Sequence, residues 1–254
     1  MSKVDAYLAK QTLLSKANYQ FWKAMTTGNT RIITRMHVEG RENVPKTGGF
    51  VLAPVHRSYI DTPISAVVTR RRLRYMAKDS MWKSPIWGWL ISSVGGFPVS
   101  RGTTDIEALK RCFLLLEQGE PIVMFPEGER KSGPIVQPLF EGAAYVAAHG
   151  RVPIIPVGIG GSEAVMPKGA KFIRPHKVRV VVGKPIYPLI PAQGRVPRSE
   201  VKRLSAELHD ELQRLFDRAQ AGLATPGDSA ARIRTQSDEL AAANADNAGP
   251  DKPA

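Results

Sequence analysis

Cysteine is almost absent from this chain of 254 residues, because Cys112 is the only one. A single cysteine cannot form an intramolecular disulfide, and it excludes a zinc site built from several cysteines. Histidine is also scarce, with five residues, and these show no metal-ligand spacing. We therefore expect neither a disulfide framework nor a bound metal.

Long hydrophobic runs are absent too. A membrane-spanning helix needs ~18 or more apolar residues, and the longest candidate, residues 86–99, is interrupted by three glycines, two serines and a proline. The first residues, Met-Ser-Lys-Val-Asp, lack the apolar core of a secretory signal. We expect neither a spanning helix nor a cleaved signal, which leaves attachment to a membrane surface open.

Acidic residues are outnumbered: 36 lysines and arginines face 23 aspartates and glutamates, a net charge of +13. Residues 225–254 carry three basic and five acidic side chains, so the first 224 residues hold about +15. Such a surplus favours an anionic partner, which is nucleic acid, anionic lipid or a phosphorylated substrate. Charge alone does not choose among them.

The middle of the chain alternates short apolar runs with helical stretches. Strands are expected at residues 50–55, 73–77, 121–125, 153–158 and 178–182. Helices are expected at residues 62–69, 104–118, 142–148 and 199–219. This alternation predicts an α/β fold: a three-layer single domain in which helices flank a partly parallel mixed sheet. The domain is expected to span residues 31–220, and the tail 221–254, poor in large apolar residues, to be disordered.

Residues 1–30 form an amphipathic N-terminal helical segment in this prediction, with a helix at residues 4–26 that ends at Gly28. Two interpretations stay open: the helix covers the core, or it lies on a membrane surface, where basic and aromatic residues suit anionic lipid. Residues 81–90 hold three of the four tryptophans beside basic residues. They suit either core packing or a loop or short helix at a bilayer interface.

One short motif carries the chemistry: His56-Arg-Ser-Tyr-Ile-Asp61 directly follows the apolar run 50–55. A histidine at the end of a buried strand can meet an aspartate that opens the next helix. Asp61 would then fix the tautomer of the His56 imidazole, and the other ring nitrogen could take a proton from an alcohol. In the structural alternative, Asp61 is only the N-cap of that helix.

Two further positions suit a substrate site. Glu127 follows the expected strand 121–125, and catalytic loops of α/β folds usually lie at such carboxyl ends. Its neighbour Gly128 permits close approach of the backbone to a substrate. Arg101 follows a Gly-Gly turn and a strand-like segment, where a guanidinium can bind a phosphate through two parallel hydrogen bonds. The alternatives are a plain surface turn at Glu127 and a solvated Arg101.

Four segments resemble, in order, the four sequence blocks of the glycerolipid acyltransferase family with its His-x4-Asp motif: residues 56–61, 95–101, 125–130 and 152–158. The best-known bacterial members are 1-acyl-glycerol-3-phosphate acyltransferases. The resemblance extends over roughly residues 36–190. Glu129 is a departure, because the family usually has threonine or serine there. It leaves open the details of acceptor binding.

The resemblance implies transfer of a fatty acyl group from acyl-CoA or acyl-ACP (acyl carrier protein) to the free hydroxyl of lysophosphatidic acid, which gives phosphatidic acid. It implies catalytic roles for His56 and Asp61. It implies substrate-binding roles for Arg101, Glu127, Gly128, Arg130, Lys78 and Arg57. Because an acyl thioester is already activated, no nucleophilic serine is required, and Ser58 is expected to be a bystander. The acyl thioester is a co-substrate, and no cofactor or metal is implied.

The resemblance also implies a peripheral, monotopic enzyme on the cytoplasmic face of the cell membrane. An anionic donor and acceptor account for the positive charge, and no nucleic-acid-binding motif is present, so no nucleic-acid partner is expected. Two alternatives stay open: the acceptor is glycerol 3-phosphate or another lysophospholipid, or the protein is a non-catalytic binder of lipid surfaces.

Overall fold

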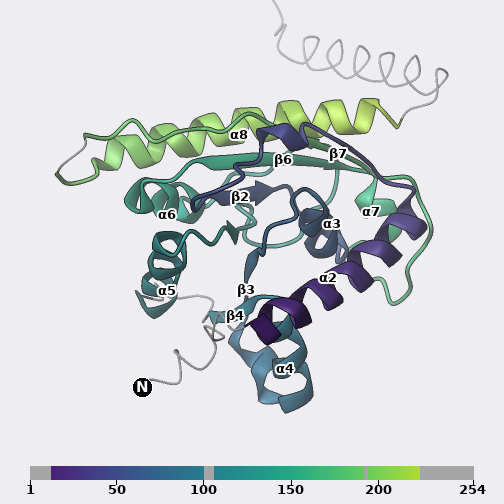
Figure 1. Ribbon diagram of the computed structural model, residues 1–254. Helices are drawn as coiled ribbons and strands as arrows, with labels where there is room; N and C mark the ends of the chain where they lie inside the picture. The colour runs from purple at the N-terminus through teal and green to yellow at the C-terminus, as the bar shows by residue number, and fades with distance from the viewer. Residues whose placement is uncertain (1–12, 100–105, 192–193, 224–254) are drawn as a thin grey trace, which may run out of the picture.

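The computed structural model describes residues 13–99, 106–191 and 194–223. Its helices are α2 (Leu13–Thr34), α3 (Asp61–Val67), α4 (Pro85–Ser93), α5 (Ile106–Glu117), α6 (Gly142–Gly150), α7 (Ser162–Val165) and α8 (Arg198–Ala221), with 3-10 turns η1 (Arg41–Asn43) and η2 (Asp79–Lys83) (Figure 1). Its strands are β1 (His37–Glu39), β2 (Val51–Pro54), β3 (Arg74–Lys78), β4 (Gly96–Val99), β5 (Ile122–Val123), β6 (Ile154–Gly160) and β7 (Arg179–Val182).

Within the described residues the strands form one seven-stranded sheet in the order β1-β7-β6-β2-β5-β3-β4. Strands β2 to β6 run parallel to one another, β7 pairs antiparallel with β6, and β1 pairs parallel with β7. The predicted mixed, partly parallel sheet is confirmed. Parallel strands with helical connections place their carboxyl ends at one edge of the sheet.

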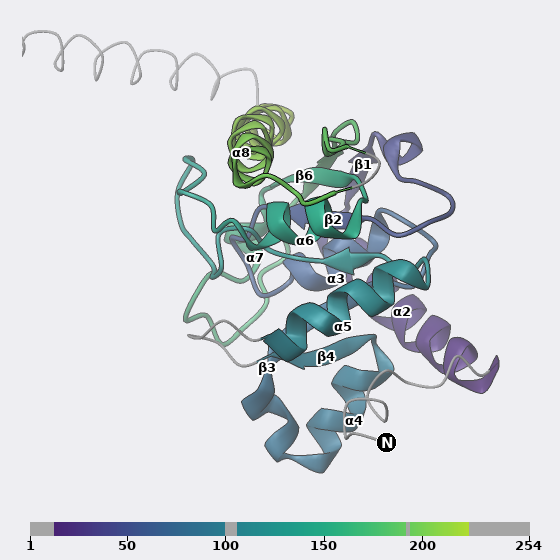
Figure 2. The same ribbon diagram turned by 90° about the vertical axis from the view of Figure 1, so that its left-hand side faces the viewer.

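Helices cover the two faces of the sheet. Figure 1 shows α5 and α6 at the left, α2 and α3 at the right, and α8 across the top, above β6 and β7. In Figure 2, α8 is seen nearly along its axis, above β6 and β2. The approach of α8 depends on Gly158, where a Cβ atom would lie 2.4 Å from the backbone of Leu215. Layers on both faces explain why every residue of β2 is buried.

The structure corrects the predicted end of the N-terminal helix. The helix does not end at Gly28 but continues to Thr34, and Arg35 follows with a positive φ of 42°. The hydroxyls of Thr30 and Thr34 donate to the carbonyls of the residues four positions earlier, within the helix. Glycine inside a helix costs only about 1 kcal/mol. Residues 1–12 of the segment, and the tail from residue 224, lie outside the described residues.

Two strands, β1 and β4, and two helices, α4 and α7, were not among the predicted strands and helices, although a short helix was one interpretation of residues 81–90. β1 has three residues and lies at an edge of the sheet, and β4 was described only as strand-like because it contains glycine and proline. The short helix α7 follows β6 and leads into the segment 166–177. Among the described residues, no helix combines the length and the apolar character that crossing a membrane requires.

Candidate active site

The carboxyl ends of β2 and β5 bring the predicted site residues together. His56 lies two residues after the end of β2, and Glu127 lies four residues after β5. The two segments are joined directly, because the backbone N–H of His56 donates to Oε2 of Glu127 at 3.2 Å. A second link joins the same loops, since the Lys131 N–H donates to the His56 carbonyl at 2.9 Å.

The His56 ring contacts Asp61 as the motif predicts. Nδ1 lies 3.0 Å from Oδ2 of Asp61, and because an ionised carboxylate only accepts, we assign the proton to Nδ1. The ring stacks on Phe125 with centroids 4.0 Å apart. The His56 side chain is 14% exposed and Asp61 is fully buried. Within the described residues, Nε2 has no hydrogen-bond partner, so it is the ring nitrogen open to a substrate.

Backbone groups of the preceding turn also fix the Asp61 carboxylate. Its Oδ2 also accepts the backbone N–H groups of Arg57 and Ser58, each at 2.6 Å. The N-cap of α3 is Ile60, and no side chain caps this helix, so the interpretation of Asp61 as a simple N-cap is wrong. Its other oxygen, Oδ1, is buried and has no hydrogen-bond partner among the described residues.

Ser58 lies inside the turn rather than facing outward. Its side chain is buried, and the hydroxyl donates to the carbonyl of Met166 at 2.7 Å. The backbone N–H of Tyr59 donates to the same carbonyl at 3.1 Å. The motif is thereby attached to the segment that follows α7.

Arg57 and Glu127 form a buried ion pair, with Nη1 2.7 Å from Oε2 and side chains 1% and 0% exposed. The remaining donors of Arg57 reach the carbonyls of Gly133 and Ile135, and Oε1 of Glu127 accepts the N–H of Gln137 at 3.0 Å. We expected both side chains to bind substrate. Their partners in this structure are protein groups, which favours a role in positioning His56. The predicted substrate-binding roles stay predictions.

Gly128, Glu129 and Arg130 follow on an exposed turn. Gly128 has a φ of +73°, and a Cβ atom there would lie 2.6 Å from the Phe140 ring. The Glu129 carboxylate pairs with Lys131 at 2.9 Å and Lys168 at 3.3 Å. The hydrogen bond from Lys131, followed by that from Lys168, holds the pKa of Glu129 below its ordinary value.

Arg130 stacks on the motif itself. Its guanidinium carbon lies 3.6 Å from the centroid of the Tyr59 ring, and its Nε is buried without a hydrogen-bond partner in the described part of the chain. The contact with Tyr59 had no sequence signal, because the two residues are 71 positions apart. Arg130 is thus held against the motif by the Tyr59 ring.

The remaining predicted residues are placed only in part. Lys78 is the last residue of β3, and its backbone pairs with Val99 of β4 at the same edge of the sheet. Arg101, which follows β4, lies outside the described residues. Its predicted role in phosphate binding stays a prediction.

A groove lies beside the motif, and it was not predicted from the sequence. It has a volume of about 370 Å³ and lies between α2 and α3. Its walls include Ile60 and Thr62, the two neighbours of Asp61, and it extends to Tyr19 and Lys23 of α2. Burial lowers the pKa of Lys23 to about 8, and its ammonium donates to the carbonyls of Thr69 and Arg71. No periodicity signals this groove, because polar residues of α2 help to line it.

No cluster of three or more histidine, cysteine, aspartate or glutamate side chains that could hold a metal occurs in the described ranges. His56 and Asp61 are engaged with each other and with the preceding turn. The site is therefore described by its proton-transfer groups and its basic residues.

Comparison with solved structures shows the class of fold. The crystal structure of the 1-acyl-sn-glycerophosphate (LPA) acyltransferase PlsC from Thermotoga maritima is similar, with a TM-score of 0.67 and 24% sequence identity; the match covers 84% of this chain and 85% of that one. The family model "Acyltransferase" matches residues 35–160, which include the His56-Asp61 motif and Glu127. The chain belongs to the glycerolipid acyltransferase family.

Curated relatives agree with this assignment. The chloroplastic 1-acyl-sn-glycerol-3-phosphate acyltransferase BAT2 of Brassica napus is 31% identical over 154 residues, which is 59% of this chain and 44% of the relative. The 1-acyl-sn-glycerol-3-phosphate acyltransferase of Bacillus subtilis is 28% identical over 151 residues, covering 59% of this chain and 73% of the relative. The match thus spans less than half the length of the plant protein.

Proposed function

We propose that this protein transfers a fatty acyl group from acyl-CoA or acyl-ACP to the free hydroxyl of a lysophosphatidic acid and forms phosphatidic acid. The observation that carries the proposal is the His56-Asp61 pair, in which Nδ1 is bound to a buried carboxylate and Nε2 is left without a partner among the described residues. The names of the curated relatives favour the same acceptor.

The chemistry requires one proton to move twice. Nε2 of His56 takes the proton of the acceptor hydroxyl as its oxygen attacks the carbonyl carbon of the thioester. The charged imidazolium is stabilised by Asp61 Oδ2, 3.0 Å from Nδ1. The carbon–sulfur bond then breaks, and the thiolate leaves with that proton as a free thiol. No acyl-enzyme is formed in this route, and the buried Ser58 hydroxyl, engaged with Met166, plays no part in it.

Arg57 and Glu127 position this centre. Glu127 accepts the backbone N–H of His56 and the guanidinium of Arg57, while the backbone N–H of Arg57 donates to Asp61. These bonds fix the two segments that carry the histidine and the aspartate. Pre-organised geometry of this kind lowers the cost of reaching the transition state.

The phosphate of the acceptor is proposed to bind at the turn after β5 and at Arg101. Arg130 lies beside the motif and is held there by the Tyr59 ring. An arginine can bind a phosphate through two parallel hydrogen bonds. Lys131 and Lys168 outnumber the single carboxylate between them, Glu129, so the turn keeps a positive surplus.

The groove between α2 and α3 is proposed to hold a fatty acyl chain. It borders Asp61 through Ile60 and Thr62, has a volume of about 370 Å³ and is lined largely by apolar groups. That volume suits a lipid-like ligand. The groove adjoins the catalytic pair only through these two neighbours, since neither His56 nor Asp61 lines it.

The membrane surface is the proposed location of the reaction, on the cytoplasmic face of the cell membrane. Large apolar side chains of α2 and α4 are exposed on one side of the molecule, among them Phe21, Ile32 and Ile86. Trp22 and Trp89 meet edge to face at 6.2 Å and join the two helices. Exposed apolar and aromatic residues beside basic ones suit a bilayer interface.

A thiol-release assay tests the proposal, with purified protein, acyl-CoA, and four acceptors: lysophosphatidic acid acylated at either position, glycerol 3-phosphate and lysophosphatidylcholine. Release that depends on lysophosphatidic acid is the expected result. Thiol release with only another acceptor would assign that acceptor to the enzyme in place of lysophosphatidic acid. Binding to lipid without release from any acceptor would favour the non-catalytic alternative.

A further inference from the structure

A loop after α7 presents apolar and basic side chains together. It leaves the fold at Val165 and returns at Arg174, whose N–H donates to the Val165 carbonyl at 2.9 Å. At its tip Phe172 is 81% exposed and Ile173 is 48% exposed. Residues 164–178 contain four lysines or arginines and no aspartate or glutamate. Exposed apolar side chains next to basic ones form the combination that binds an anionic bilayer surface.

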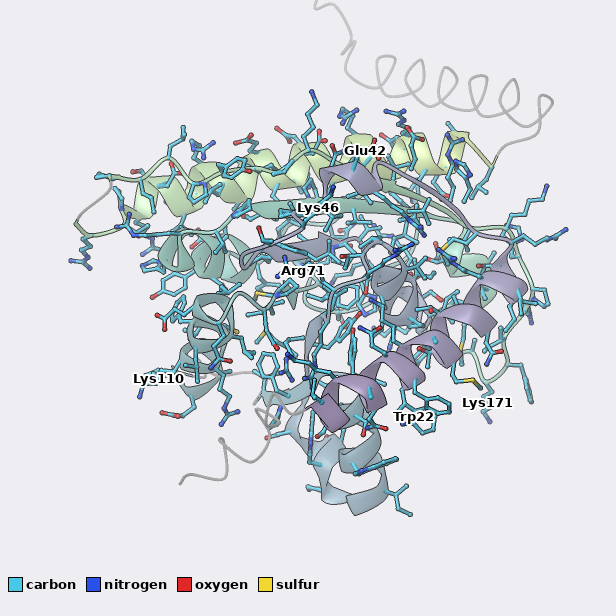
Figure 3. All side chains as sticks on the ribbon, viewed as in Figure 1. Trp22, Glu42, Lys46, Arg71, Lys110 and Lys171 are labelled. Carbon is cyan, nitrogen blue, oxygen red and sulfur yellow. The ribbon has the colours of Figure 1, made fainter. Side chains whose placement is uncertain are left out.

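The loop approaches the C-terminal half of α2 at the groove. Figure 3 shows Trp22 of α2 and Lys171 of the loop at the same lower edge, both away from the sheet. Ile173 lines the groove between α2 and α3 together with Ile33 of α2. The tip of the loop therefore reaches the groove through Ile173.

The base of the loop is tied to the catalytic motif. The carbonyl of Met166 accepts hydrogen bonds from the Ser58 hydroxyl and the Tyr59 N–H. Lys168 pairs with Glu129 on the turn after β5 at 3.3 Å, and the turn and the loop lie together on the left of Figure 2. These contacts fix the position of the loop relative to His56.

We propose that residues 166–174 form a lipid-binding loop that inserts Phe172 into an anionic bilayer. The inference rests on the proposed function, in that it names the surface from which the acyltransferase would take its lipid. Charge complementarity selects the partner: Lys171 and Arg174 flank the apolar tip, and each basic residue near an anionic membrane strengthens binding by about five-fold. Ile173, the neighbour of Phe172, lines the groove, so insertion of the tip brings the groove next to the bilayer.

The test is binding of the full chain to sedimented vesicles of phosphatidylcholine, with and without phosphatidylglycerol. Phe172→Glu is expected to lower the partition coefficient on anionic vesicles roughly ten-fold or more. The variant removes the aromatic ring that inserts into the bilayer and adds a negative charge. Leu189→Glu is the matched control, because Leu189 is also an exposed apolar loop residue but lies in the segment after β7. Equal loss in both variants, or no loss in Phe172→Glu, overturns the inference.

A charge variant tests the choice of an anionic partner. Lys171→Glu is expected to weaken binding to vesicles with phosphatidylglycerol and to leave binding to pure phosphatidylcholine unchanged, whereas Lys184→Glu, also exposed, leaves both unchanged. Equal weakening on both lipids overturns the anionic assignment.

Activity in solution separates the loop from the chemistry. With a short-chain lysophosphatidic acid and a short-chain acyl-CoA below their micelle-forming concentrations, Phe172→Glu is expected to keep the wild-type kcat/KM. A loss there means that the loop acts in the reaction and overturns the inference. If the wild-type protein releases no thiol with any acceptor, the proposed function fails, while the vesicle measurements still decide the loop.

Discussion

The Arg57 guanidinium and the Glu127 carboxylate meet 2.7 Å apart in the interior, and Glu127 also accepts the backbone N–H of His56. The positive charge and the negative charge come from two different blocks of the family motif, and both side chains are buried. The reactive histidine is therefore supported by an ion pair that links two loops at one edge of the sheet.

This pair predicts a stability effect. Glu127→Gln leaves the buried Arg57 without its carboxylate, and breaking one half of a buried ion pair costs about 3–5 kcal/mol. Thermal unfolding is expected to shift down by roughly 10 °C. Glu117→Gln, at an exposed position of α5, serves as the control and leaves the midpoint nearly unchanged. A Glu127→Gln variant that keeps wild-type stability but loses acceptor affinity would instead indicate direct substrate contact.

Glu129 predicts a change in acceptor affinity without a change in stability. Glu129→Gln removes an exposed negative charge and releases Lys131 and Lys168, so the KM for lysophosphatidic acid should fall about two- to five-fold. The KM for acyl-CoA is expected to stay constant in the same steady-state assay. Glu107→Gln, which removes another exposed carboxylate paired with a lysine, is the matched control. A rise in the acceptor KM would contradict the assignment of this turn.

Gly128 predicts a steric cost. Gly128→Ala meets the Phe140 ring and also places an alanine at a φ of +73°, whereas Gly133→Ala at +85° has open space around it. The strain of a positive φ, about 1–2 kcal/mol, is common to both variants. Displacing the exposed Phe140 ring from its rotamer adds about 0.5–1.5 kcal/mol to the first alone. Chemical denaturation measures the difference. Phe140→Ala removes the ring, so in that background Gly128→Ala and Gly133→Ala should lose similar unfolding free energies. If their difference stays the same, the contact with Phe140 is not its cause.

Lys23 predicts a pH dependence of stability. Its folded pKa of about 8 lies below the ordinary value of 10.5, because burial disfavours the charged form. Between these values the unfolded state binds the proton and the folded state does not, so this group adds stability as pH rises from 8 toward 10.5. The unfolding midpoint of the wild type relative to Lys23→Met should therefore rise over this range and stay flat below pH 7. A constant difference from pH 6 to pH 10 would contradict the buried ammonium.

The central strands, the main helices and the His56-Asp61 contact could be predicted because their signals are local. Apolar runs mark β2 and β6, and five positions separate the histidine from the aspartate across one turn. The pairing of Arg57 with Glu127 could not be predicted, because 70 residues separate them and only the sheet brings them together. For this reason both side chains were expected to bind substrate.

The groove and the C-terminal end of α2 could not be predicted from the sequence, for a different reason. Periodicity assigns apolar residues to the inner face, yet Phe21 and Met25 of α2 are exposed, whereas Thr30 and Thr34 are buried. The inner face of α2 borders the groove rather than the closely packed core. The exposure of these apolar residues and the burial of these threonines follow from tertiary contacts, which helix propensity and periodicity do not predict.

The central claim is that His56 takes the proton of the acceptor hydroxyl. The direct measurement is thiol release from acyl-CoA with lysophosphatidic acid by His56→Ala, beside the wild type and Asp61→Asn, each checked for an unchanged unfolding midpoint. Loss of a general base lowers kcat by about 10²–10⁴ or more, and we expect that loss in His56→Ala and a smaller one in Asp61→Asn. A folded His56→Ala variant that releases thiol at close to the wild-type rate would contradict the account.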